Sequence, residues 1–106
     1  MLHANLAKGK WFTMSLAEQL GNVGSEYDRM IKAKLAGNEA RRESAMLRFL
    51  ELIDLTLADS RWSGPARREL ARLREQSLDE LAQPSENAKS LSRYYRQFAT
   101  LARAKF

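Results

Sequence analysis

Apolar residues recur at steps of three and four in four separate segments of the chain, and this spacing constrains the fold more than any other feature. Side chains three and four positions apart lie on the same face of an α-helix. No segment alternates between apolar and polar residues for long enough to predict a strand. The sequence therefore predicts an all-α fold, a four-helix bundle with short loops.

The first predicted helix covers residues 15–37. Ser15 and Glu18 have the spacing of a capping box, in which each side chain bonds a backbone amide at the start of the helix. Its apolar face consists of Leu16, Leu20, Val23, Tyr27 and Met30. Gly37 and Asn38 predict its C-terminal end, because glycine followed by a polar residue commonly closes a helix.

The second predicted helix, residues 39–58, is apolar around more than one face. Its main stripe consists of Met46, Phe49, Leu50, Ile53 and Leu57. Leu47, Leu52 and Leu55 lie outside that stripe. This surplus leaves two interpretations: the helix is the central one of the bundle, or it also supplies a subunit interface.

Two further helices are predicted after the clearest break in the chain, at residues 59–65. Pro65 suits the first turn of a helix over residues 65–82, and Pro84 follows its end. The last helix is predicted over residues 88–104. Its apolar face consists of Leu91, Tyr94, Tyr95, Phe98, Leu101 and Ala102.

Gly21 and Gly24 lie three apart within the first predicted helix and form the only glycine-rich stretch of the chain. A phosphate-binding glycine loop follows a strand and opens a helix, where backbone amides are still unpaired. These glycines instead come after the capping box. We expect them to allow another helix to pack closely, with a local kink as the alternative.

Few residues suit catalysis or metal binding. The chain has no cysteine, and its single histidine, His3, has no cysteine or clustered carboxylates near it in sequence. Glu51 and Asp54 share a polar strip with Arg48, which predicts either a solvated strip or a buried cluster facing an arginine from elsewhere. We expect no catalytic residue, no metal, no cofactor and no small-molecule substrate.

Positive charge gathers at the two ends of the chain, which carries a net charge of +5. In the last predicted helix, basic residues fall at steps of four, three and seven on one side: Lys89, Arg93, Arg96 and Arg103. Such a row can pair with successive phosphates and gain affinity from counterion release. A nucleic-acid-binding site is one hypothesis and a solvated helix face is the other. The aromatic residues of this helix are expected to fill the core.

Residues 1–12 are predicted to form an N-terminal arm of a single domain that covers residues 1–106. The arm has no apolar run followed by a small-residue cleavage site, and no segment approaches the roughly 20 apolar residues of a membrane helix. These patterns predict a cytoplasmic protein without a membrane partner. Trp11, Phe12 and Trp62 are expected to cover an end of the bundle.

Several separated motifs resemble a group of small uncharacterised prokaryotic helical proteins. The similarity covers KGKWFTMSLAEQLGNVGSEYDR at residues 8–29, ELIDLTLAD at 51–59, RRELARLRE at 67–75 and YYRQFATLARA at 94–104. Its main motif is KGxW followed by LxEQLxNxGSE. The polar or special positions that match are Trp11, Glu18, Gln19, Asn22, Gly24, Ser25 and Glu26.

The resemblance implies a helical fold without an established activity. If the members share a site, the resemblance points to the polar side of the first helix, at Glu18, Asn22, Ser25 and Glu26. A structural role for these residues, in capping and in hydrogen bonds between helices, is the alternative.

Together these observations favour a non-enzymatic helical bundle that acts through macromolecular contacts, as a homo-oligomer that associates through its first or second helix. The alternative is a nucleic-acid-binding accessory protein that uses the basic residues of the last helix. An enzyme that uses carboxylates of the first helix is a third hypothesis, which requires a cleft and a perturbed pKa.

Overall fold

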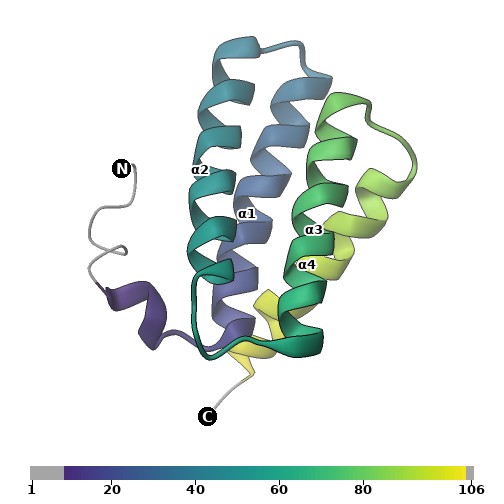
Figure 1. Cartoon of the computed structure of the whole chain (residues 1–106). Helices are drawn as coiled ribbons and strands as arrows, with labels where there is room; N and C mark the ends of the chain where they lie inside the picture. Colours follow the sequence, from purple (N-terminus) through teal and green to yellow (C-terminus); the bar gives the residue numbers. More distant parts are fainter. Residues whose placement is uncertain (1–8, 105–106) are drawn as a thin grey trace.

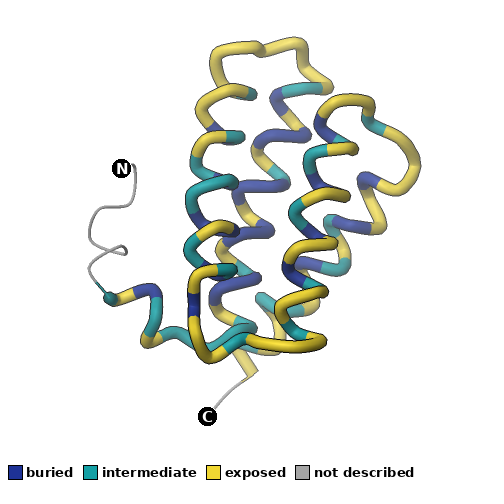
Figure 2. Tube along the Cα trace, in the orientation of Figure 1, coloured by how far each residue is buried: buried dark blue, intermediate teal, exposed yellow. Residues whose placement is uncertain are grey.

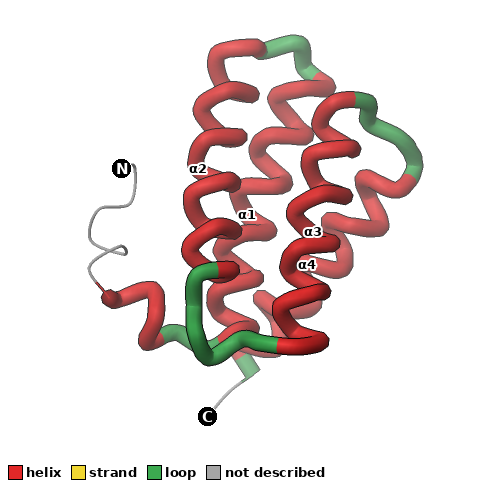
Figure 3. Tube along the Cα trace, in the orientation of Figure 1, coloured by secondary structure: helices red, strands yellow, loops and turns green. Residues whose placement is uncertain are grey.

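A computed structural model describes residues 9–104 of the chain. Its helices in chain order are η2 (Trp11–Thr13), a short 3₁₀ helix, and the α-helices α1 (Leu16–Leu35), α2 (Glu39–Leu57), α3 (Gly64–Ala82) and α4 (Asn87–Arg103) (Figure 1). No strand occurs in residues 9–104, and short loops join the four α-helices (Figure 3). The predicted all-α four-helix bundle is therefore confirmed.

The ends of α1 follow from local chemistry. The Glu18 amide donates to the Ser15 hydroxyl at 3.1 Å, and the Ser15 amide donates to the Glu18 carboxylate at 2.9 Å, which completes the capping box. At the other end, Gly37 has a φ of 70°, and the Asn38 amide donates to the Ala33 carbonyl at 2.9 Å. A left-handed glycine thus closes the helix. The observed bounds of all four helices differ from the predicted ones by at most two residues.

The central helix of the bundle is α1, with α2 packed along one side and α4 along the other (Figure 1). Nine of its 20 residues are buried, against five of 19 in α2. The interpretation that placed the second helix at the centre is therefore wrong. Of its surplus leucines, Leu52 is buried, Leu55 is half-buried against the core, and Leu47 is 47% exposed. Figure 2 shows the buried positions on the inward sides of the helices.

The core is made of large apolar side chains from every helix. Its fully buried members include Trp11, Leu20, Val23, Tyr27, Met30, Phe49, Ile53, Leu70, Leu73 and Tyr95. The Tyr27 hydroxyl donates to the Ala88 carbonyl at 2.9 Å, and the Tyr95 and Ser77 hydroxyls pair at 2.8 Å. Burial raises the pKa of both tyrosines above the ordinary value, so both stay protonated. These bonds fix α4 against α1 and α3.

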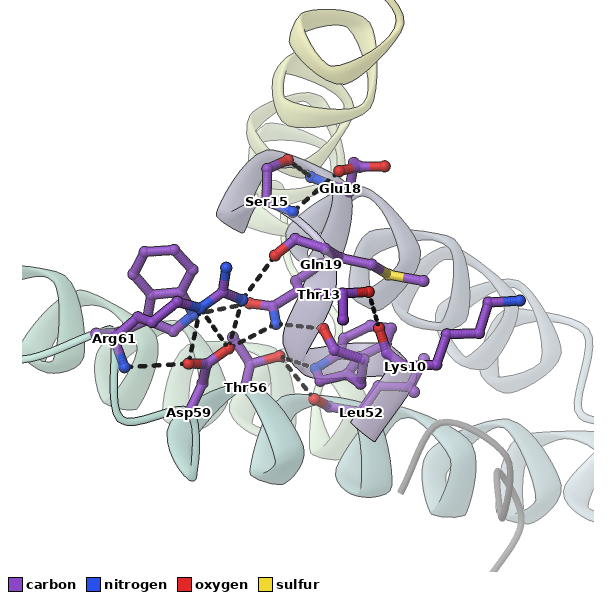
Figure 4. Close-up of polar contacts among 12 residues, drawn as sticks. Lys10, Thr13, Ser15, Glu18, Gln19, Leu52, Thr56, Asp59 and Arg61 are labelled. Atoms are coloured by element: carbon purple, nitrogen blue, oxygen red, sulfur yellow. Dashed lines mark hydrogen bonds and ion pairs between the residues drawn. The ribbon is translucent and has the colours of Figure 1, made fainter. Parts of the chain in front are cut away.

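A polar network docks η2 onto the bundle (Figure 4). The indole Nε1 of Trp11 donates to the Thr56 hydroxyl at 3.1 Å, and Thr56 donates to the Leu52 carbonyl at 2.8 Å. The Gln19 amide donates to the Trp11 carbonyl at 2.9 Å and to Asp59 at 3.0 Å. Trp11 and Gln19 are both fully buried. Trp11 therefore covers the end of the bundle where α1 begins and α2 ends.

Asp59 anchors the loop between α2 and α3 to this network. Arg61 donates to its carboxylate through Nη2 at 2.7 Å and Nε at 3.0 Å, and it also donates to the Met14 carbonyl at 2.6 Å. The hydrogen bonds from Arg61, aided by one from Gln19, lower the pKa of Asp59 to about 2 although burial opposes this shift. Every buried side-chain nitrogen and oxygen in the described part of the chain has a partner. The network is thus a structural element with no buried polar group left for a ligand.

The lowered pKa of Asp59 predicts a specific loss of stability in acid. An unfolded aspartate has an ordinary pKa of 3.8. The Asp59 carboxylate therefore contributes stability above about pH 4, which is lost as the pH falls from about 4 to about 2. We expect Asp59→Asn to flatten the dependence of the free energy of unfolding on pH in this window, as measured by urea denaturation. Asp79→Asn, at an exposed carboxylate, is the control and should keep the wild-type profile. Identical profiles for Asp59→Asn and the wild type would refute this role.

Candidate nucleic-acid interface

The basic residues of α4 face solvent, and most of its apolar residues face the bundle, but Leu101 of the predicted apolar face is 61% exposed. Ala88, Leu91 and Tyr95 are buried on the inward side, since residues three and four apart share a helix face. The basic residues lie on a neighbouring side of the helix and all four are exposed: Lys89, Arg93, Arg96 and Arg103. We call these four residues the α4 basic stripe.

The charges of the α4 basic stripe are largely uncompensated. Arg93 and Arg96 each donate to a serine hydroxyl on the preceding turn, at 3.3 and 3.2 Å. Arg96 also lies 3.8 Å from a carboxylate oxygen of Asp28 on α1, a long ion pair between partly exposed groups. Within residues 9–104, neither Lys89 nor Arg103 forms an ion pair. The stripe therefore presents positive charge to solvent.

The arginines of α3 differ from those of α4 because most of them bond to carboxylates or a carbonyl of the chain itself. Arg72 pairs with Glu69 on the same helix. Arg74 donates to Asp54 of α2 at 2.8 Å, and Arg67 donates to a backbone carbonyl of α2. Asp54 is exposed, so the polar strip of α2 is solvated there and also meets an arginine from another helix. The contacts of Arg67 and Arg74 help to hold α3 on α2, so these arginines are less available to a ligand than the cations of α4.

Gly21 and Gly24 let α4 approach α1 closely. A Cβ atom built on Gly24 would lie 2.4 Å from the Cβ of Tyr95, and one on Gly21 would lie 3.1 Å from the Cα of Ala99. Both glycines lie inside the continuous helix Leu16–Leu35. The neighbour that fills the glycine strip is therefore a helix of the same chain.

The polar positions of α1 do not all share one face. Glu18, Asn22 and Ser25 are exposed. The Asn22 amide donates to the Glu18 carbonyl at 2.9 Å, and the Ser25 hydroxyl donates to the Gly21 carbonyl at 3.3 Å. Glu26 is 3% exposed and lies on the side toward α2, so the predicted common polar face is wrong at this position. Two arginines neutralise its charge, which makes burial of the carboxylate tolerable.

On the exposed side of α1, Ser25 lies beside two residues of the α4 basic stripe. A shallow groove of about 270 Å³ runs between α1 and α4, and its lining includes Ser25, Asp28, Arg96 and Arg103. The structure thus combines one part of the predicted polar face with two residues of the stripe. Asn22 and Glu18 do not line this groove.

The aromatic residues of α4 are engaged within the bundle. Tyr95 is buried, and Tyr94 is half-buried and donates to Glu69 at 2.7 Å. Burial, and then the bond to Glu69, raise the pKa of Tyr94. The rings of Tyr94 and Phe98 pack edge to face with centroids 5.2 Å apart. These rings are not free to stack on bases.

The described residues offer little for other kinds of site. In residues 9–104, no three histidines, cysteines or carboxylates come together in a way that could hold a metal ion. His3 lies outside the described residues. Glu51, the other carboxylate of the α2 strip, is half-buried. None of the described helices has both the length and the apolar character needed to cross a membrane.

Comparison with known proteins gives no family or function for the chain. No protein-family model, curated protein or solved structure matches the chain. The resemblance to small prokaryotic helical proteins stays a prediction.

Proposed function

We propose that this protein binds the phosphate backbone of nucleic acids through the α4 basic stripe, as a non-enzymatic accessory protein of the cytoplasm. The observation that supports this proposal is the contrast between two helices. Three of the four arginines of α3 bond to carboxylates or a carbonyl of the chain, and within residues 9–104 the four cations of α4 form a single ion pair, at 3.8 Å. Exposed guanidinium groups are well suited to phosphate because they donate several hydrogen bonds from a planar fork.

The length of the stripe suits a run of phosphates. Lys89 and Arg103 are separated by 14 residues, or about 21 Å along a helix that rises 1.5 Å per residue. Each strand of duplex DNA carries one phosphate per about 3.4 Å of the duplex axis, so a length of about 21 Å along that axis corresponds to about six phosphates of one strand. The stripe is therefore long enough for its four cations to reach four phosphates.

The proposed binding does not depend on base sequence. Base recognition requires side chains that reach base edges or rings that stack on bases. The aromatic residues of α4 are turned into the bundle, and the stripe contributes cations alone. We therefore expect similar affinities for duplexes of different sequence at the same salt concentration.

Removing two cations of the stripe should weaken binding strongly. Among the described residues, neither Arg93 nor Arg103 forms a hydrogen bond or an ion pair with another helix. We expect Arg93→Gln/Arg103→Gln to raise the dissociation constant for a labelled DNA duplex on the order of 60-fold at about 0.1 M salt, because each phosphate contact contributes a factor close to eightfold there. Fluorescence anisotropy measures this change.

The matched control removes two cations from other surfaces. Lys34 on α1 and Arg68 on α3 also form no ion pair within residues 9–104, so Lys34→Gln/Arg68→Gln gives the same net charge. This control should bind with nearly the wild-type affinity. Equal losses in the two double variants would mean that net charge, and not the stripe, governs binding. Wild-type protein that does not bind duplex DNA or RNA even at low salt would refute the proposal.

Self-association is the second candidate function, and its support is weaker. The glycine strip that motivated it is filled by α4 of the same chain. Most of the surplus leucines of α2 pack against the core. The exposed large apolar residues Leu35, Leu47 and Leu101 lie on three different helices. Light scattering tests this candidate, and a homo-oligomer at micromolar concentration would support it.

A further inference from the structure

A second basic feature lies on the other side of α1, in a groove of about 430 Å³ between α1 and α2. Four cationic side chains line it, Arg29 and Lys32 from α1 and Arg41 and Arg48 from α2. Small residues, including Ala33 and Ala45, leave space between the two helices. None of the described residues that line this groove is a carboxylate.

The buried carboxylate of Glu26 accepts hydrogen bonds from two of these cations. One of its carboxylate oxygens accepts from Nη1 of Arg29 at 2.6 Å, and the other accepts from Nε of Arg48 at 2.8 Å. Arg48 also donates through Nη1 to the Ser44 hydroxyl at 2.6 Å. The Glu26 side chain is 4% exposed, so it is a fixed anchor. The guanidinium groups are thereby oriented before any ligand arrives, which reduces the entropy lost on binding.

One carboxylate does not balance the charge of this cluster. Glu26 offsets one of the four positive charges, and within residues 9–104 Lys32 and Arg41 have no ion pair. The groove therefore carries about three unbalanced positive charges around a single cavity. The groove also reaches Asn38, the N-cap of α2, and the N-terminal end of a helix adds a partial positive charge.

We propose that the groove between α1 and α2 is a binding site for a phosphate group, in the dianionic form carried by phosphomonoesters and by inorganic phosphate. A tetrahedral dianion offers several acceptor oxygens to the converging N–H groups of arginine and lysine. A single carboxylate offers one charge and two oxygens, so it would leave more of the cluster unpaired. The groove and the α4 basic stripe share no residue, so this inference does not depend on the proposed function.

Binding of inorganic phosphate tests the site directly. We expect saturable shifts of the backbone amide signals of Lys32, Arg41 and Ser44 in NMR titrations of the full chain at constant ionic strength. Lys32→Gln/Arg41→Gln removes two exposed cations whose side chains form no hydrogen bond or ion pair with another helix among residues 9–104, so the fold should be kept. This variant should weaken phosphate binding at least tenfold, since each charged hydrogen bond removed costs about a factor of ten.

The control is again Lys34→Gln/Arg68→Gln, which should leave the affinity for phosphate unchanged. Lys34 lies on the same helix as Lys32 but does not line the groove. The proposal is overturned if phosphate gives no saturable shifts, if the two double variants behave alike, or if acetate binds as tightly as phosphate.

Oligonucleotides distinguish two ligands that carry such a phosphate group, the end of a nucleic acid and a free phosphorylated molecule. In the Arg93→Gln/Arg103→Gln background, a short single strand with a 5′-phosphate is compared with the same strand without it. Tighter binding of the phosphorylated strand that is lost on adding Lys32→Gln/Arg41→Gln supports the end of a nucleic acid as the ligand. Equal binding of the two strands, together with saturable shifts from inorganic phosphate, supports a free phosphorylated molecule.

Discussion

Trp11→Ala is expected to lower the free energy of unfolding by about 3 to 5 kcal/mol, the range measured for removing large aromatic side chains from protein cores. Trp11 is fully buried, and its Nε1 bonds the Thr56 hydroxyl across 45 residues of sequence. Its removal leaves a cavity and deprives the buried Thr56 oxygen of a donor. Because small domains have about 5 to 15 kcal/mol of stability, this one change should remove a large part of it. Urea denaturation followed by circular dichroism measures the loss.

Trp11→Phe separates packing from hydrogen bonding in this prediction. Phenylalanine keeps much of the buried area but has no N–H group for Thr56. We expect a loss of about 1 to 3 kcal/mol, smaller than that of Trp11→Ala. A Trp11→Ala variant with the wild-type denaturation midpoint would show that η2 is not docked onto the bundle as described.

Gly24→Ala is expected to lower the free energy of unfolding by about 2 kcal/mol, and the melting temperature by about 10 °C for a domain of this size. The new methyl group would lie 2.4 Å from the Cβ of Tyr95, an atom close to the α4 backbone that cannot rotate away. An approach this close should cost about 3 kcal/mol, the upper end of the usual range for overpacking, and the better helix propensity of alanine returns about 1 kcal/mol. Differential scanning calorimetry measures the change.

Gly21→Ala is the matched control in the same helix. Its Cβ would lie 3.1 Å from the Cα of Ala99, a contact that a small shift of α4 can relieve. We expect a stability within about 1 kcal/mol of the wild type, because the gain in helix propensity offsets the contact. A Gly24→Ala variant at least as stable as Gly21→Ala would contradict the close approach of α4 to α1.

The helices could be predicted from the sequence because their signals are local. The capping box at Ser15 and Glu18 and the stop at Gly37 involve residues within a few positions of one another. Which helix lies at the centre could not be predicted in this way. The buried face of α1 contains Gln19 and Glu26, which count as polar in any apolar pattern. Their burial depends on partners from other segments. The sequence pattern alone therefore favours α2, which has more leucines, as the central helix.

The candidate site also combines a local pattern, which the sequence predicts, with tertiary contacts, which it does not. The spacing of the α4 basic stripe is a local pattern, and the structure places all four residues on an exposed face. Which other arginines are neutralised is a tertiary property. Arg74 meets Asp54 and Arg48 meets Glu26 over separations of 20 and 22 residues, which no periodicity specifies. The basic groove between α1 and α2 was missed for this reason, since its cations come from two helices and its anchor is a buried carboxylate.

The salt dependence of nucleic-acid binding tests the central claim most directly. The dissociation constant for a DNA duplex is measured by fluorescence anisotropy across a series of salt concentrations, for the wild type and for Arg93→Gln/Arg103→Gln. Four phosphate contacts predict a slope of about −3 to −4 for the logarithm of the association constant against that of the salt concentration, and the variant should have a slope smaller in magnitude by about 2. A wild-type slope near zero, or an unchanged slope in the variant, would contradict binding of the phosphate backbone by the α4 basic stripe.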